Sequence, residues 1–510
     1  MKKPVLTALT AVAAAAFMAV AQESAGNVSA DNGISANNNA LTAGNAPSAV
    51  APAALPPGKP RHNLSLEDAL QRSIRDNPLV QIERINTGIA KSLEADNDAA
   101  YDPRLRASYT VSERAARGIA NSHDFAVSVT APFSTGTTVE AGIGASPYSS
   151  AKDSLMNFQN SIGVTVTQAL LQGRGAAANL VQLKKARLDI DIRQEELAAY
   201  AQRILADTER AYWDLRFSGE QMNIYKYSLE LAQRLLYESE ERLKLGGIAP
   251  IDLVAIRAEV ASRERQLFDA QVSYDQKALY LKYLMNAPAL WDAELALTDS
   301  ASSLSTADGI AEHIEAAKMF RTDYLVAFKQ AEKGVLDLVQ TKNGMMPKLD
   351  AFVSLQGLTP AETFPGALIP GSGISGAVSA GLTLNYPFKN RAAQERHRRT
   401  GFSLEQQKLS IENYAKLMEY EVRSAHMEVL RARQQVATAA EVGALQAQKL
   451  EAEQDKMDAG KSTGYAVLQV QRDVVSAQLD EAQARTAYTT ALISLYTKDG
   501  TLLRRRGVKF

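Results

Sequence analysis

The stretch Leu243-Lys-Leu-Gly-Gly-Ile-Ala-Pro-Ile-Asp252 separates the longest helical pattern of the chain from a shorter one. Residues 176–244 precede it without a proline, and residues 252–285 continue the helical pattern after it. Two glycines stop the first helix, and a proline suits the first turn of the next one. At about 1.5 Å per residue the first helix is roughly 100 Å long. The stretch therefore predicts an antiparallel helical hairpin much longer than a compact core requires.

The same pattern occurs a second time further along the chain. Residues 391–457 form another long helical pattern, which stops at Asp458-Ala-Gly460, and a shorter one covers residues 464–498. When the two glycine turns are aligned, Glu259 falls on Asp473. A recurrence of this length indicates an internal duplication.

The two copies differ in length at one place. The offset between them is 244 residues at Pro103 and Pro347, but 217 residues at Arg174 and Arg391. The second copy therefore lacks 27 residues that the first copy has between its proline and its arginine.

The first residues have the pattern of a secretory signal. Two lysines precede an apolar run at 5–20, which ends at the small-residue cleavage pattern Ala19-Val-Ala21. The alternative interpretation is a membrane anchor, but the run is short for a helix that spans a membrane. Small and polar residues follow, too poor in large apolar side chains to order themselves. We predict this division of the chain: signal peptide 1–21, flexible leader 22–62, first repeat 63–300, second repeat 301–500 and a solvated basic tail 501–510.

Between the helical patterns the hydrophobic period falls from about 3.6 residues to about two, which is typical of strands. Strands with one apolar face and one small polar face suit a sheet between lipid and water, although a half-buried soluble sheet is the alternative. The extra residues of the first copy predict a further hairpin at 125–145, either within the sheet or beside it. The four principal strands are expected at 105–111, 162–166, 349–355 and 378–384.

No apolar run outside the signal is long enough for a membrane-spanning helix, so a chain that crosses a membrane must do so as a closed barrel. Membrane barrels have at least about eight strands, so four strands per chain require several chains. The predicted fold class is α+β and mainly α. It consists of duplicated helical hairpins with four or so amphipathic strands that form part of a shared barrel.

Composition and motifs give no indication of an enzyme. The net charge of −1 does not suggest a nucleic-acid partner, and the chain has no cysteine. Its five histidines form no metal-binding pair. Gly371-Ser-Gly-Ile-Ser-Gly376 matches a dinucleotide motif but precedes a strand instead of a helix. We therefore predict no catalytic residue, no cofactor and no metal.

Three segments together resemble the outer-membrane efflux protein family, the TolC-like channels. They are Thr167-Gln-Ala-Leu-Leu-Gln-Gly-Arg-Gly175, residues 243–259 and residues 457–472, and the resemblance extends over both copies, from about 64 to 498. It implies a homotrimer that shares a 12-stranded barrel in the outer membrane of a Gram-negative cell. A helical tunnel would cross the periplasm, with a periplasmic adaptor (membrane fusion protein) and an inner-membrane pump docked at the helical tips.

The resemblance also implies which residues form the gate. Asp252 matches the family's tip aspartate, so we expect it to make either a contact that closes the tip or a docking contact. The alternative is a carboxylate that only stabilises the start of its helix. Ala466 and Gln469 occupy positions where some relatives carry an acidic ring, so the chain departs from the pattern there. The tip candidates are Gly246, Gly247, Asp252, Asp458, Gly460 and Lys461, and the strand-to-helix junctions are Gly173, Arg174 and Arg391.

The predicted function is that of an exit duct in tripartite efflux or type I secretion, through which substrates pass passively. A periplasmic adaptor and an elongated coiled-coil scaffold are the alternatives. An adaptor has one hairpin between β-rich modules, and a scaffold requires no amphipathic strands, so the duplication and the strands favour the duct.

Overall fold

The computed structural model describes residues 60–115, 119–148, 157–245, 250–299, 309–368 and 375–508. All of them lie in the second of two units, which are Met1–Gly58 and Lys59–Phe510. The predicted signal peptide, most of the predicted leader and the tip glycines Gly246 and Gly247 lie outside the described residues. So do the first four residues of the 371–376 glycine motif.

Two helices precede the large sheet, α2 (Leu66–Arg75) and α3 (Pro78–Asp98), and the short η1 (Ala99–Tyr101) follows them. The Ser65 hydroxyl accepts the Asp68 backbone N–H at 3.1 Å and caps α2. Asn77 caps α3 in the same way, and Pro78 occupies its first position. The Asn-Pro pair therefore starts a new helix.

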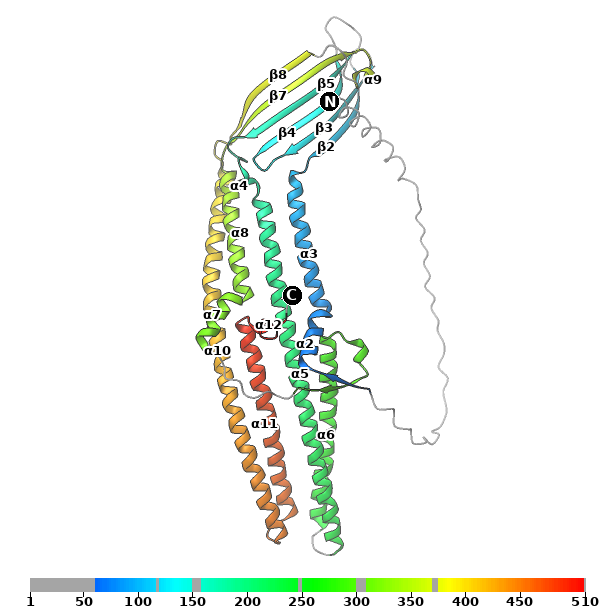
Figure 1. Ribbon diagram of the computed structural model, residues 1–510, viewed down its shortest axis with the longest axis vertical. Coiled ribbons are helices and arrows are strands. Elements are labelled where there is room, and N and C mark those ends of the chain that lie inside the picture. Colours follow the sequence, from blue (N-terminus) through cyan, green and yellow to red (C-terminus); the bar gives the residue numbers. More distant parts are fainter. Residues whose placement is uncertain are drawn as a thin grey trace, which may run out of the picture. The chain divides into compact units, whose positions relative to one another are not determined.

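The six-stranded sheet is antiparallel throughout, with the order β2-β3-β4-β5-β7-β8 (Figure 1). The predicted extra hairpin is β3–β4. It lies inside the sheet, between the two strands that we assigned to the first copy, so the described residues contribute six strands. The strands are β2 (Arg104–Ala115), β3 (Ile119–Pro132), β4 (Thr137–Tyr148), β5 (Asn157–Ala169), β7 (Lys348–Ala361) and β8 (Ser375–Asn385).

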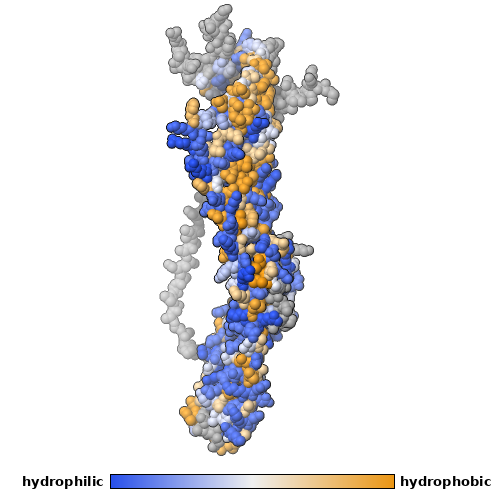
Figure 2. All heavy atoms as spheres, turned by 90° about the vertical axis from the view of Figure 1, so that its left-hand side faces the viewer, coloured by the Kyte–Doolittle hydropathy of each residue, from blue (hydrophilic) through white to orange (hydrophobic). Residues whose placement is uncertain are grey.

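The register of the sheet collects its apolar side chains on one face. Directly paired residues of neighbouring strands point to the same side. The pairs include Val127 with Ile143, Val139 with Val166, Val353 with Ala380 and Leu349 with Leu384. The other face carries small and polar residues, such as the pair Thr165 and Ser354. Figure 2 shows apolar side chains gathered at the level of the sheet.

The two long helices and their partners form as predicted. The first copy contains α4 (Ala176–Asn179), α5 (Val181–Lys244) and α6 (Pro250–Leu284), with one interruption at Leu180. The second contains α10 (Arg391–Asp458) and α11 (Gly464–Lys498). Before these lie α7 (Ile310–Phe320) and α8 (Thr322–Gly344), which are separated at Arg321. The order of elements over 66–284 thus recurs over 310–498, except for β3–β4. The short helices are η2 (Pro288–Leu290), α9 (Phe364–Ala367) and α12 (Leu502–Arg505).

The helices pack as two rows of four. Next to the sheet the order is α3-α5-α8-α10, and at the tips it is α6-α5-α11-α10 (Figure 1). The largest apolar core lies where the rows meet and includes Leu64, Leu205, Tyr212 and Leu281. No described helix is both long enough and apolar enough to cross a membrane.

Both ends of the described chain contribute to this core. Strand β1 (Arg61–Leu64) pairs in parallel with β6 (Glu294–Leu297). The first described strand therefore begins at Arg61, inside the segment 22–62 that we predicted as a flexible leader.

The predicted solvated tail is also wrong for the described residues up to 508. Leu502 is fully buried, because it fills the core beside α5. Arg506 donates from Nε to Glu209 at 3.0 Å, and Arg504 stacks on Phe320 at 3.8 Å. Buried Glu209 requires a cation, which this segment supplies.

Candidate functional site

The first helical tip lies where we predicted that one helix ends and the next begins. Helix α5 ends at Lys244, and α6 begins at Pro250. Asp252 lies in the first turn of α6. Its part in closing or docking the tip stays a prediction.

The second tip is a glycine-terminated turn. Asp458 is the last residue of α10, and Gly460 has a φ of +70°, a conformation that glycine adopts without strain. The Lys461 backbone N–H donates to the Lys456 carbonyl at 2.8 Å, as in a Schellman motif. Thr463 then caps α11 with its side chain. The candidates Asp458, Gly460 and Lys461 are thus brought together within one turn.

The positions of the family's acidic ring are neutral in this chain. Ala466 is half-buried and Gln469 is exposed, both on α11. Near this tip, Glu453 on α10 accepts hydrogen bonds from Ser462 and, at 3.0 Å, from Lys456. The Ser462 hydroxyl, and then Lys456, hold the pKa of Glu453 below its ordinary value.

A charged cluster connects the two hairpins further from the tips. Glu259 of α6 accepts from Arg263 Nε at 2.9 Å and from Arg472 Nε of α11 at 3.0 Å. Arg263 also donates from Nη1 to the carbonyl of Ser228 on α5, at 3.0 Å. One carboxylate therefore joins three helices, and Arg472 makes the connection between the hairpins.

This cluster is shielded from water on one side only. Glu259 is 7% exposed and Arg263 is 3% exposed, whereas 52% of the Arg472 side chain remains exposed. The hydrogen bonds from Arg472 lower the pKa of Glu259 and outweigh its burial, and Arg263 adds to this effect. The carboxylate is consequently ionised at neutral pH, and the outer arginine can be removed from it more easily than the inner one.

Sequence reasoning missed this cluster, although a signal for it exists. Leu253, Ile256 and Val260 are buried at helical spacing on α6. Glu259 and Arg263 fall on the same helix face with the favourable i, i+4 order. Two opposite charges within an apolar stripe indicate a buried ion pair.

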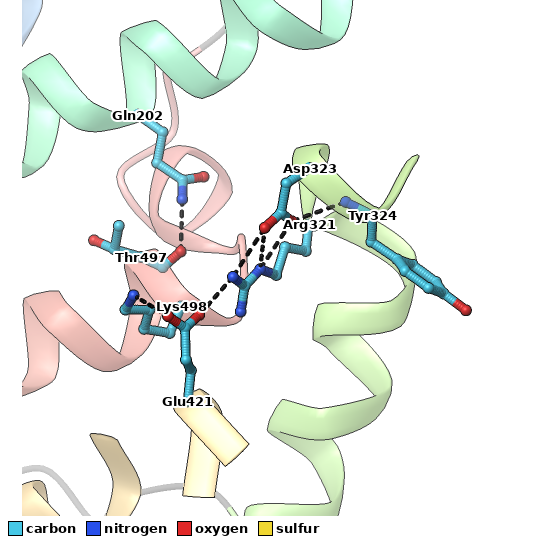
Figure 3. A network of polar contacts seen from close by, with 7 residues as sticks. All are labelled: Gln202, Arg321, Asp323, Tyr324, Glu421, Thr497 and Lys498. Atoms are coloured by element: carbon cyan, nitrogen blue, oxygen red, sulfur yellow. Dashed lines mark hydrogen bonds and ion pairs between the residues drawn. The ribbon is translucent and has the colours of Figure 1, made fainter. Parts of the chain in front are cut away.

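A second cluster holds the base of the α10/α11 hairpin (Figure 3). Arg321, between α7 and α8, forms an ion pair with Glu421 of α10 at 2.5 Å and a two-pronged contact with Asp323. Lys498, at the end of α11, donates to the other Glu421 oxygen at 2.9 Å. Burial opposes ionisation of Glu421, but Lys498 and Arg321 outweigh it and lower its pKa. Nearby, Gln202 of α5 donates to the Thr497 carbonyl at 2.8 Å.

The predicted junction residues lie where strands become helices. Gly173 has a φ of +84°, its carbonyl accepts from Asn179 at 2.8 Å, and Arg174 follows it in the turn. Arg391 is the first residue of α10, directly after Asn390, whose φ of +38° turns the chain out of β8.

The described residues contain no group of three histidine or carboxylate side chains that could hold a metal ion. The clusters at Glu259 and Glu421 connect helices through ionised carboxylates that are already paired.

Comparisons with known proteins agree with this geometry. Residues 340–501 match the family model described as outer membrane efflux protein. No curated protein sequence matches the chain. The fold is similar to that of the Campylobacter jejuni CmeC outer membrane channel, with a TM-score of 0.63 and 12% identity over 85% of each chain.

Two further solved structures share the fold. The Vibrio cholerae outer membrane protein VceC has a TM-score of 0.65 and 15% identity, over 85% of this chain and 96% of its own. The open state of the Neisseria gonorrhoeae MtrE outer membrane channel has a TM-score of 0.62 and 14% identity, over 85% and 88%. Family and fold are those of channels, not enzymes, and the predicted resemblance and fold class are confirmed. Residues 340–501 therefore match the outer membrane efflux protein family, and the described chain has the fold of the outer membrane channels named above.

Proposed function

We propose that this protein is the outer-membrane exit duct of a tripartite efflux or secretion system. The observation that carries the proposal is the apolar face of the sheet, most of which the described chain leaves exposed. Helix α9 covers it only near Asn160, whose side chain donates to the Ala367 carbonyl at 2.6 Å. Leu105, Leu382 and Val378 are 63%, 69% and 75% exposed. Apolar surfaces of this extent mark contact with a membrane or a partner. A polar opposite face suits a wet lumen, so lipid is the occupant that fits.

The open edges of each layer support an assembly of several copies. β2 and α3 lie at one side, and β8 and α10 at the other. Helix α3 exposes Ile82, Ile85, Ile89 and Leu93, an apolar stripe at helical spacing. Side-by-side copies would cover such stripes and close both helical rows into a tunnel. The family resemblance adds that the assembly is a homotrimer, with the helices in the periplasm and an adaptor and an inner-membrane pump at the tips.

We assign the gate to the α10/α11 hairpin. The Arg321 cluster fixes its base, whereas Arg472 ties it to Glu259 closer to the tip. Release of this outer tie would let the second hairpin move away from the first while its base stays in place. Asp252, Asp458 and Lys461, at the tips themselves, remain the proposed docking positions for the adaptor.

The first test is the mass of the detergent-extracted protein, measured by light scattering with the detergent contribution subtracted. We expect a membrane-bound species of three chains. A monomer or dimer that washes off membranes in salt, without detergent, would refute the duct and favour an adaptor or scaffold.

The second test is single-channel conductance in planar bilayers. Arg472→Ala removes the outer tie and is expected to raise the open probability several-fold. Lys449→Ala is the matched control, because it breaks an exposed pair with Asp473 within the same hairpin. If both variants behave like the unmodified channel, the gate does not depend on this tie.

A further inference from the structure

The described sheet has six strands, whereas the row of helices next to it has four members. Four strands connect directly to a helix of the row next to the sheet. β2 connects to α3, β5 to α4–α5, β7 to α8 and β8 to α10. β3 and β4 connect only to other strands. The width of the sheet is therefore not set by the number of helices below it.

The β3–β4 hairpin is an integral part of the sheet. It pairs with β2 from Arg104↔Thr130 to Ala115↔Ile119 and with β5 from Thr137↔Gln168 to Tyr148↔Asn157. Full-length pairing on both sides excludes a flap that lies against the sheet.

The turn of this hairpin also packs into the base of the sheet. The Thr135 carbonyl accepts from the Gly175 backbone N–H at 3.0 Å. Gly136 has a φ of +86°, and a Cβ there would meet the Gly173 carbonyl oxygen at 2.2 Å. Only glycine allows this approach, so the hairpin is locked to the strand-to-helix junction.

The two edges of the sheet are complementary in direction. β2 runs away from the helices and β8 returns to them, because six antiparallel strands are an even number. Within the described residues each of these strands is paired on one side only. β2 of one copy can therefore pair with β8 of the next in the antiparallel sense that closed membrane barrels require.

We propose that three copies close a barrel of 18 strands, an inference that rests on the proposed function and sharpens it. With strands about 4.8 Å apart and tilted about 40°, 18 strands give a diameter of roughly 36 Å, against roughly 24 Å for 12 strands. The apolar face contacts lipid and the polar face lines the lumen.

The side chains on the polar face leave this lumen open. Ser128, Gly142 and Gly163 follow one another across three neighbouring strands, and all are small. A barrel of this width would admit larger hydrated solutes from outside than a 12-stranded one.

The experiment measures entry of polyethylene glycols into the lumen from the external side of a planar bilayer, through their effect on conductance. A variant without residues 116–148 joins β2 to β5 through the existing 149–156 segment and leaves four strands. We expect its cut-off radius to be about one third smaller than that of the full chain. Glu140→Gln, which keeps all strands, is the matched control and should leave the cut-off unchanged.

End-on electron cryomicroscopy of the full chain supplies a measurement that does not depend on the deletion variant folding. A trimeric barrel about 36 Å wide supports the inference. A trimer with a barrel about 24 Å wide overturns it but leaves the exit duct intact. A protein that forms no membrane-bound trimer overturns both.

Strand order is tested by cross-linking, because the chain has no native cysteine. Ser108→Cys on β2 combined with Ser379→Cys on β8 should give covalent trimers with a short bismaleimide. Ser128→Cys on β3, combined with the same β8 substitution, should not. The reverse result would show that β2 is not the joining edge.

Discussion

The two helical hairpins place their aligned acidic residues in opposite environments. Glu259 of the first hairpin is buried among Arg263, Ser228 and Arg472. Its counterpart Asp473 pairs only with Lys449, and about half of each of these side chains is exposed. The acidic residue of the first hairpin thus makes a buried tie, which Arg472 extends to the second hairpin beside the apolar contact of Leu468 with Leu235 and Ile256, whereas Asp473 makes only an exposed pair within its own hairpin. The difference indicates that duplicated units can share a fold and still divide rigidity and movement between them.

The largest effect is expected for Arg263→Leu. It leaves the Glu259 carboxylate buried beside Ser228 with only the half-exposed Arg472 as a partner. Removal of one partner of a buried pair typically costs about 3–5 kcal/mol. The measurement is the loss of helical circular dichroism on heating or in urea. A loss below about 1 kcal/mol would show that the first hairpin does not depend on its buried pair.

The pH dependence of stability is expected to distinguish the two hairpins further. The pKa of Glu259 is lowered from its ordinary value of 4.5, so its contribution to stability is present above that value and disappears as the pH falls through the lowered pKa. The tie should therefore persist from pH 8 to pH 5 and weaken only in stronger acid. Glu259→Gln should cost about 1.5–3 kcal/mol at pH 7 and remove this acid-sensitive part. An unchanged acid profile in the variant would assign the sensitivity to other groups.

The turn of the second tip is expected to show a moderate effect. Gly460→Ala forces a side chain into a positive φ and should cost about 1 kcal/mol. Gly88→Ala in α3 is the control, since a Cβ there meets nothing within 4 Å. It should stabilise the helix by about 0.5–1 kcal/mol. Thermal midpoints that shift in the same direction would contradict the assignment of the turn.

The smallest effect is expected for Asp473→Asn. An exposed pair contributes about 0.2–1 kcal/mol and is screened by salt. The thermal midpoint should fall slightly at low salt and match that of the unmodified protein at high salt. A loss as large as that of Arg263→Leu would mean that the two hairpins are equivalent.

The helices were predictable because their ends have local causes. The glycine turns, Pro250 and the Thr463 cap act within a few residues, and the ends of α10 and α11 agree with the prediction to within one residue. The alternating strands were equally clear. Periodicity does not specify which strand pairs with which, so the place of β3–β4 inside the sheet required the structure.

The charged clusters were not predicted because their partners come from distant parts of the chain. Arg472 reaches Glu259 across 213 residues, and Arg506 reaches Glu209 across 297. In the sequence, Arg506 belongs to a short basic run with no visible partner. Its partner is the buried Glu209 of α5, which it reaches because the segment around α12 packs on α5. Whether Asp252 docks a partner depends on a second molecule, which a single chain does not contain.

The β1–β6 pairing has a consequence for the order of folding. Arg61 contacts Glu294 across 233 residues, so the first repeat is enclosed by strands that directly precede and follow it. Such a non-local contact forms slowly, but it is available as soon as residue 297 has emerged. The first repeat can therefore close early, although its core remains incomplete until Ile493 and Leu502 arrive. The last helix to be synthesised thus completes the first core to be started, and stable folding requires nearly the whole chain.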